Sequence, residues 1–255
     1  MHCGLRFRWL LVSATLLFAV SLRAEESLPV SHWLEKGNEA YAQFENTAAR
    51  EQFRNALEGD PKNYEAAWKL ARAYVDVGEG LDNREKRKEH YKKAYTAARK
   101  AVEIRPEGSK GHLYLSISLG RVALDEGAKE KVRLSKEVKE EVDRALELDP
   151  DEDIAWHVLA LWHRNVATLS WIEKKFADLF LGGVPEEASL ESAVTCLKRA
   201  IGLNPRYVNH YLELGITYEL MGKDAPARDQ YRKALQLPIG DSDDKAHKEE
   251  ARRRI

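Results

Sequence analysis

Hydrophobic and polar positions recur along this chain in a pattern that ends each time at a proline. Five phrases share it, with an alanine, apolar residues and then the proline: "NALEGDP", "KAVEIRP", "RALELDP", "RAIGLNP" and "KALQLP", which end at Pro61, Pro106, Pro150, Pro205 and Pro238. Proline cannot continue a helix, because it has no amide hydrogen and its ring clashes with the preceding turn. Each phrase therefore predicts the end of one helix and the turn into the next.

A row of small and large side chains leads into each phrase and ends at its alanine, and its members share one helix face because they are spaced by four residues and then three. The five rows are Ala49/Phe53/Ala56, Ala94/Ala98/Ala101, Val138/Val142/Ala145, Ala193/Leu197/Ala200 and Ala227/Tyr231/Ala234. A partner row precedes each one: Trp33/Gly37/Ala40, Leu70/Ala71/Tyr74, Leu115/Ser116/Leu119, Leu159/Ala160/His163 and Leu214/Gly215/Tyr218. Small members allow two helices to approach closely, and large members fill the space beside them. The rows predict five helical hairpins, near residues 30–61, 63–106, 108–150, 152–205 and 207–238.

The last unit resembles the tetratricopeptide repeat, whose period is about 34 residues. Its marks are "YLELGITY", from Tyr211 to Tyr218, followed by Ala227, Tyr231 and Ala234. The three other intervals between phrases, Ala56 to Ala101, Ala101 to Ala145 and Ala145 to Ala200, are longer, so three hairpins carry insertions. We therefore expect an all-α protein, with an α-solenoid of about five tetratricopeptide-like hairpins over residues 25–238. Residues 239–255 are expected to form a C-terminal capping helix.

The insertion in the fourth hairpin, "TLSWIEKKFADLFLGGVP", differs from the charged insertions before it. An amphipathic helix is predicted there, and its apolar residues are Trp171, Ile172, Phe176, Leu179 and Phe180. We expect this helix to pack against the solenoid and close one end of its groove, because an apolar stripe is usually core. A membrane surface and a protein partner are the alternatives. Lys174 and Lys175 favour the membrane surface, whereas Glu173 and Asp178 weaken it.

The first helices of stacked hairpins line a concave surface. Residues that lie beside the packing row of each first helix are therefore candidates for binding. These candidates are Trp68, Arg72, Leu113, Ile117, Arg121, Leu161, Arg164, Leu212 and Ile216. Such an apolar groove is unusual without an occupant. One possible occupant is an amphipathic ligand whose anionic head pairs with Arg72, Arg121 and Arg164. The other is the inserted helix of this chain.

Catalytic chemistry finds little support in the sequence. His157 and His163 are six residues apart and point away from each other on a helix, so they do not form a shared metal site. The chain has neither a phosphate-binding glycine loop nor a Gly-x-Ser-x-Gly motif. Its net charge of −1 gives no basic field for nucleic acid. We therefore predict no catalytic residues, no metal and no cofactor.

The first residues resemble a secretory signal peptide, residues 1–24. Arg6 and Arg8 precede an apolar core from Trp9 to Ser21, and Ala24 offers a cleavage point. That core is shorter than the roughly 20 residues of a membrane span. We expect a periplasmic or secreted protein, with an uncleaved N-terminal anchor as the alternative. Cleavage would leave Cys196 as the remaining cysteine, so no internal disulfide is expected.

The stretch from Trp156 to Pro238 resembles the regulator of microtubule dynamics family. The marks are two tryptophan-containing helices, a basic pair before Ala and Leu-Phe, then Pro-x-x-x-Ser and an Asn-x-Tyr-Leu-x-Leu-Gly helix. The resemblance implies a non-enzymatic repeat domain, in a family linked to microtubules, mitochondria and membrane contact sites, with phospholipid binding and transfer in one member. The export signal departs from that setting and favours an exported bacterial relative.

Three hypotheses for function follow. The first is a binding or scaffold protein that holds a protein segment in its concave groove. The second is a carrier of an amphipathic ligand such as a phospholipid. The third, by resemblance alone, is association with microtubules, which the export signal disfavours.

Overall fold

The computed structural model describes residues 28–181 and 183–255, so the signal-peptide prediction lies outside the described residues. Regular structure in these residues is entirely helical. The helices are α1 (Val30–Ala42), α2 (Asn46–Gly59), α3 (Tyr64–Glu79), α4 (Arg84–Ile104), α5 (Ser109–Ala123), α6 (Ala128–Leu148), α7 (Asp153–Ala167), α8 (Trp171–Leu181), α9 (Leu190–Leu203), α10 (Val208–Leu220), α11 (Asp224–Gln236) and α12 (Asp244–Arg253). None of the described helices is both long and apolar enough to cross a membrane.

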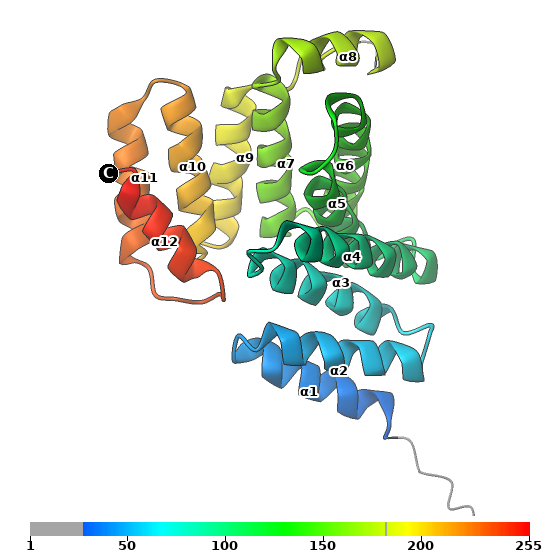
Figure 1. The fold of residues 1–255 in the computed structure, drawn as a ribbon. Coiled ribbons are helices and arrows are strands. Elements are labelled where there is room, and N and C mark those ends of the chain that lie inside the picture. Colours follow the sequence, from blue (N-terminus) through cyan, green and yellow to red (C-terminus); the bar gives the residue numbers. More distant parts are fainter. Residues whose placement is uncertain (1–27, 182) are drawn as a thin grey trace, which may run out of the picture.

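Consecutive helices pack as antiparallel pairs that stack into a curved array (Figure 1). The pairs within the described residues are α1/α2, α3/α4, α5/α6, α7/α9 and α10/α11, with α8 inserted in the fourth. The final helix, α12, packs against α10 and α11. The predicted fold class is therefore confirmed. The charged insertions of the second and third hairpins lengthen α4 and α6, which have 21 residues each.

Helix ends follow the proline phrases. In α2, α4, α6 and α9, the N–H group just after the helix donates to the carbonyl of the last alanine in the packing row: Ala56, Ala101, Ala145 and Ala200. The residue that follows each helix directly precedes the proline and leaves the helical conformation, since proline disfavours helical backbone in the residue before it. Asparagine or serine caps begin some of the next helices, as where the Asn63 side chain accepts a hydrogen bond from the Ala66 N–H.

Glycines opposite large aromatic residues bring paired helices together. A Cβ atom on Gly37 would lie 2.4 Å from the ring of Phe53, which is fully buried. In the last pair, a Cβ atom on Gly215 would lie 2.2 Å from the ring of Tyr231, which is also fully buried. The two end hairpins thus use the same interlock, in which an aromatic ring occupies the place of a missing side chain.

The Gly215→Ala variant is expected to lower the free energy of unfolding by about 1–3 kcal/mol, because the new methyl group forces the rigid Tyr231 ring to move. Gly202 in α9 is the matched control, since a Cβ atom there meets nothing within 4 Å. Gly202→Ala should stabilise the protein by about 0.5–1 kcal/mol through helix propensity alone. Urea unfolding of both variants measures this, and equal effects would show that Gly215 makes no close contact.

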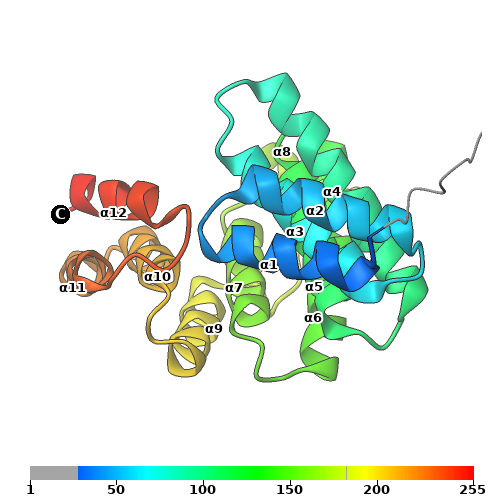
Figure 2. The same ribbon diagram turned by 90° about the horizontal axis from the view of Figure 1, so that it is seen from below.

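The C-terminal segment, residues 237–243, connects α11 to α12, and the curvature of the array brings it close to the first hairpin. Its Ser242 hydroxyl accepts a hydrogen bond of 3.0 Å from the Asn46 side chain at the start of α2. Figure 2, seen from below, shows this connection beside the first hairpin. The segment therefore lies across the concave side of the array and helps to enclose a cavity there.

Candidate functional site

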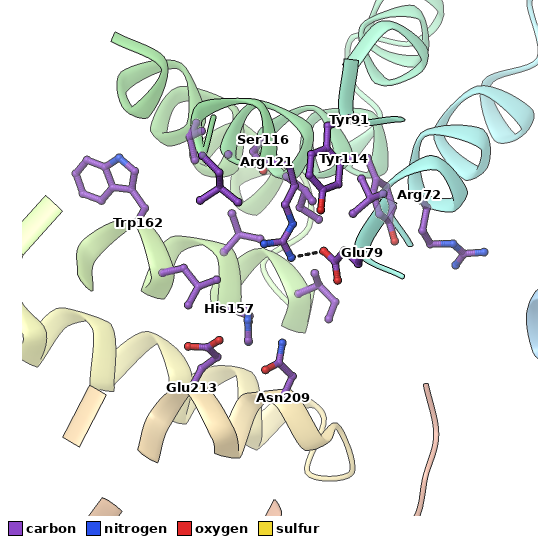
Figure 3. A pocket seen from close by; sticks show the side chains of 18 of the residues that line it. Arg72, Glu79, Tyr91, Tyr114, Ser116, Arg121, His157, Trp162, Asn209 and Glu213 are labelled. Carbon is purple, nitrogen blue, oxygen red and sulfur yellow. Dashed lines mark ion pairs between the residues drawn. The ribbon is translucent and has the colours of Figure 1, made fainter. Parts of the chain in front are cut away.

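The concave side holds a cavity of about 870 Å³, lined mainly by α3, α5, α6 and α7, with further residues from α10 and the C-terminal segment (Figure 3). The apolar part of its wall includes Val75 from α3, Ile117 from α5, and Val158 and Leu161 from α7. These side chains share the groove-facing side of three first helices. The inner surface of the solenoid thus supplies an apolar wall at the centre of the array.

Arginines of the concave side already have partners. The Arg121 guanidinium pairs with Glu79, and Figure 3 shows this contact among the cavity side chains. Arg164 donates to the Glu213 carboxylate at 2.5 Å. Arg72 lies over the ring of Tyr41, with its guanidinium carbon 3.5 Å from the ring centre, which is a cation–π contact. Two of the three arginines predicted to receive an anionic head are therefore neutralised by carboxylates.

Carboxyl groups gather where the C-terminal segment meets α3. Asp76 and Glu79 come from α3, and Asp241 and Asp243 come from the segment; all four line the cavity. Burial, with the nearby charge of Asp241, raises the pKa of Asp76 well above its usual range. Burial, a hydrogen bond with Glu79 and like charges raise the pKa of Asp243 to about 7. Burial and like charges thus disfavour ionisation of Asp76 and Asp243, and a nearby cation would offset this effect, so the acidic cluster Asp76/Asp241/Asp243 favours a positive group over a negative one.

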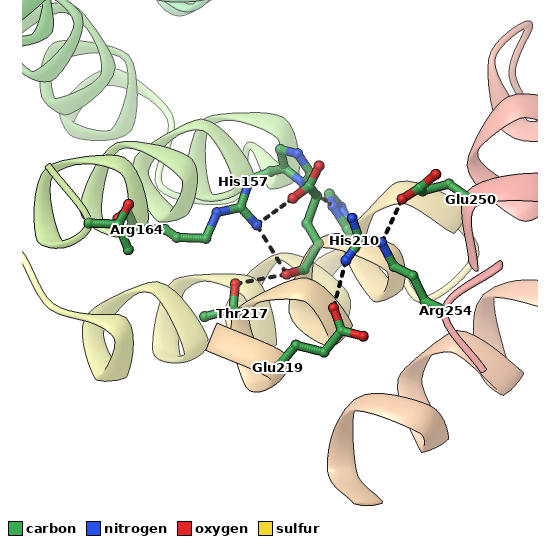
Figure 4. Close-up of polar contacts among 9 residues, drawn as sticks. His157, Arg164, His210, Thr217, Glu219, Glu250 and Arg254 are labelled. Atoms are coloured by element: carbon green, nitrogen blue, oxygen red, sulfur yellow. Dashed lines mark hydrogen bonds and ion pairs between the residues drawn. The ribbon is translucent and has the colours of Figure 1, made fainter. Parts of the chain in front are cut away.

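A chain of hydrogen bonds joins α7 to α10 at the edge of the cavity. The ring nitrogens Nδ1 of His157 and His210 are 2.9 Å apart, and His210 Nε2 lies 3.0 Å from an Asp153 oxygen. Burial lowers the pKa of His157 well below its usual range, so this ring stays neutral near neutral pH. Figure 4 shows both histidines with Arg164 and with the Arg254–Glu219 pair that fastens α12 to α10. The chain of bonds fixes the position of the cavity wall.

The structure brings together some of the predicted groove residues and separates others. Arg72, Ile117, Arg121 and Leu161 line the cavity. Leu113 and Leu212 lie in the core, with 0% and 3% of their surface exposed. The other predicted residues pack beside the cavity: Trp68 stacks on Tyr114, Arg164 pairs with Glu213, and Ile216 packs in the last hairpin. Four of the nine predicted groove residues therefore line the cavity.

Sequence reasoning missed the carboxyl cluster. Asp76 and Glu79 lie on α3, four and seven residues after the predicted Arg72, and Asp241 and Asp243 lie in the region expected to form the C-terminal capping helix. One signal was available: "LPIGDSDD" places several residues between two helices, more than a tight turn needs. No three His, Cys, Asp or Glu side chains in the described part of the chain are grouped so as to hold a metal ion.

The inserted helix α8 packs differently from the expectation. It contacts α6, with Ala177 buried and Phe176 half-buried, while Trp171, Ile172 and Leu179 are 69%, 55% and 74% exposed. The expectation that this stripe packs inward is wrong for these three side chains, because the helix docks through the neighbouring face around Ala177. The side chain of Phe180 lies outside the described part of the structure.

Fold and cavity together define a tetratricopeptide-type helical-repeat protein. A solved tetratricopeptide repeat protein of Thermus thermophilus superposes with a TM-score of 0.63 at 21% identity, covering 87% of this chain and 98% of that one. The model of the family "Regulator of microtubule dynamics protein 1-3" matches residues 33–255. The chain therefore belongs to the regulator of microtubule dynamics family, and that prediction is confirmed.

Curated relatives of the family are longer than the matched region. Regulator of microtubule dynamics protein 2 of Rattus norvegicus is 31% identical over 72% of this chain, and the match covers 45% of that protein. The human protein 2 is 30% identical over 79% of this chain, with 47% of its own length covered. The chain thus spans about half the length of these relatives.

Proposed function

We propose that this protein is a non-catalytic binding protein that holds a segment of another protein in its concave cavity. The observation that carries the proposal is the composition of the cavity wall, where an apolar surface around Ile117 and Leu161 adjoins the acidic cluster Asp76/Asp241/Asp243. A segment with an apolar side chain next to a lysine or arginine complements both features. Helical-repeat folds bind extended segments along such concave surfaces.

The carboxyl groups where the C-terminal segment meets α3 favour a basic segment over an anionic ligand. Arg121 and Arg164 are paired with Glu79 and Glu213, so neither is free to receive a phosphate without breaking an ion pair. Carboxyl groups of the acidic cluster, whose pKa values burial and like charges raise, also disfavour a further negative charge such as a phosphate. The phospholipid carrier therefore has less support in this geometry than the protein-segment hypothesis.

Two peptide pools of equal length and hydropathy, one containing lysine and one containing glutamate, test this proposal by fluorescence anisotropy. We expect the lysine pool to bind, and Asp241→Asn to weaken that binding about tenfold, which is ~1.4 kcal/mol. Asp229→Asn, on the exposed surface of α11, is the matched control and should bind as the wild type does. Equal binding of both pools, or equal effects of both substitutions, would contradict the proposed site.

Microtubule association is the second candidate function, and it is favoured by the family match over residues 33–255. The names of the relatives refer to microtubule dynamics, and the match covers less than half of those chains. Co-sedimentation of the purified protein with polymerised tubulin tests it. Protein that stays in the supernatant at all tubulin concentrations would exclude this candidate.

Export is proposed from the first residues of the sequence. If the segment 1–24 is a cleaved signal peptide, the mature chain begins at Glu25. N-terminal sequencing of the protein recovered from the host envelope or medium should then give "EESLPV". A chain recovered with Met1 still attached in the membrane fraction would support the N-terminal anchor instead.

A further inference from the structure

The inserted helix α8 presents its apolar side to solvent. Trp171, Lys175 and Leu179 follow one another at intervals of four residues, and Ile172 lies beside them, so these four side chains share one face. The three apolar members are each more than half exposed. Ala177, which is buried, lies on the opposite face toward α6. The outward face of α8 is thus more apolar than a solvated helix face normally is.

The position of α8 leaves this face free to meet a flat surface. Figure 1 shows α8 lying crosswise over the ends of α6 and α7, at the edge of the molecule. An ion pair of 3.0 Å between Lys131 of α6 and Glu173 holds its first turn in place. The Ser170 hydroxyl also donates to Glu173 at 2.7 Å, which fixes the start of the helix. The apolar residues therefore project from a supported helix, and they do not frame a groove.

Charge on α8 complements an anionic surface. Glu173 is neutralised by Lys131, so the exposed charges that remain on the helix are Lys174, Lys175 and Asp178, a net of +1. Lys175 lies within the apolar face, with its ammonium 4.6 Å from the centre of the Trp171 ring. A dry protein groove would bury this ammonium at a high desolvation cost. At a lipid surface the lysine extends toward the phosphate groups, while the tryptophan ring sits at the boundary.

We propose that the face of α8 formed by Trp171, Ile172, Lys175 and Leu179 docks on a lipid surface that carries anionic headgroups. This surface is separate from the concave cavity, so the protein is able to hold a segment in the cavity while it is attached to a membrane through α8. The apolar side chains enter the boundary between headgroups and acyl chains, and Lys174 and Lys175 contact the headgroups.

Vesicle co-sedimentation with the full chain tests the proposal, using phosphatidylcholine vesicles with and without phosphatidylglycerol. We expect the wild-type protein to bind the mixed vesicles, with binding weakened by added salt. Leu179→Asp should reduce that binding about tenfold or more. Leu220→Asp, at the half-exposed end of α10, is the matched control and should bind as the wild type does.

Both substituted residues are exposed, and helix content by circular dichroism checks that the variants fold. The proposal is overturned if the wild-type protein binds neither kind of vesicle, or if Leu179→Asp and Leu220→Asp bind equally well. It is also overturned if sedimentation without lipid shows an oligomer that Leu179→Asp dissociates, because a second copy of the chain would then cover α8. Peptide binding to the cavity is measured separately, so failure of one proposal leaves the other testable.

Discussion

Replacement of Phe53 by alanine is expected to lower the free energy of unfolding by about 3–5 kcal/mol. The ring is fully buried and fills the space opposite Gly37, between helices α1 and α2. Removing it deletes the contacts of the ring and leaves a cavity, and Gly37 has no side chain with which to fill it. Urea or thermal unfolding followed by circular dichroism measures the loss.

Phe44→Ala is the matched control for Phe53→Ala. Phe44 lies in the turn between the same two helices and is 45% exposed, so the identical chemical change removes much less buried surface. We expect a loss well below that of Phe53→Ala. Comparable losses at the two positions would mean that the interlock between Phe53 and Gly37 does not stabilise the first hairpin more than an ordinary surface contact does.

The Asp243→Asn variant is expected to be more stable than the wild-type protein above about pH 7, with a difference that disappears in acid. The folded protein keeps the Asp243 carboxyl protonated up to a pKa of about 7, whereas the ordinary value is 3.8. Between these values the folded state holds a proton that the unfolded chain has lost. The stabilisation is therefore complete below pH 3.8 and is lost as the pH rises through 7. Asparagine stays neutral and can still donate a hydrogen bond to Glu79.

At pH 8 the Asp243→Asn variant is expected to raise the free energy of unfolding by about 1–2 kcal/mol. This is less than the pKa difference alone would give, because the segment retains contact with water. His157 changes the pH dependence of stability in the opposite direction, because its pKa is lowered in the folded state. Below about pH 6.5 the unfolded chain gains a proton that the folded state excludes, so the free energy of unfolding falls in acid. The variant and the wild type are therefore compared at each pH by urea unfolding, with Asp229→Asn as control. A difference that does not change with pH would disprove the assignment to Asp243.

Local patterns in the sequence predicted most of the fold. Each proline phrase predicts where a helix ends. Each row of small and large residues predicts which face of that helix contacts the partner helix. Ala56 illustrates both, because it is fully buried and its carbonyl also accepts the hydrogen bond that closes α2. Helix ends and packing faces depend on residues only a few positions away in the sequence. The hairpins could therefore be located from the sequence alone.

The candidate site was less predictable, because its chemistry depends on contacts between distant residues. Asn46 and Ser242 are separated by 196 positions, and no local pattern shows that they meet. The acidic cluster likewise joins Asp76 to Asp241 and Asp243, which lie far from it in the sequence. For α8, periodicity identified an apolar stripe around Trp171 and Leu179, but the same stripe is compatible with packing inward or outward.

The contact between Asn46 and Ser242 also affects how the repeats unfold. In an open array of repeats, each unit touches only its neighbours, so the terminal units fray independently of each other. Here the polypeptide that follows the last hairpin is bonded to the first, and melting at either extremity removes an interaction from the other. The two extremities are thus thermodynamically coupled, and the array loses its structure more cooperatively than neighbour stacking alone would allow.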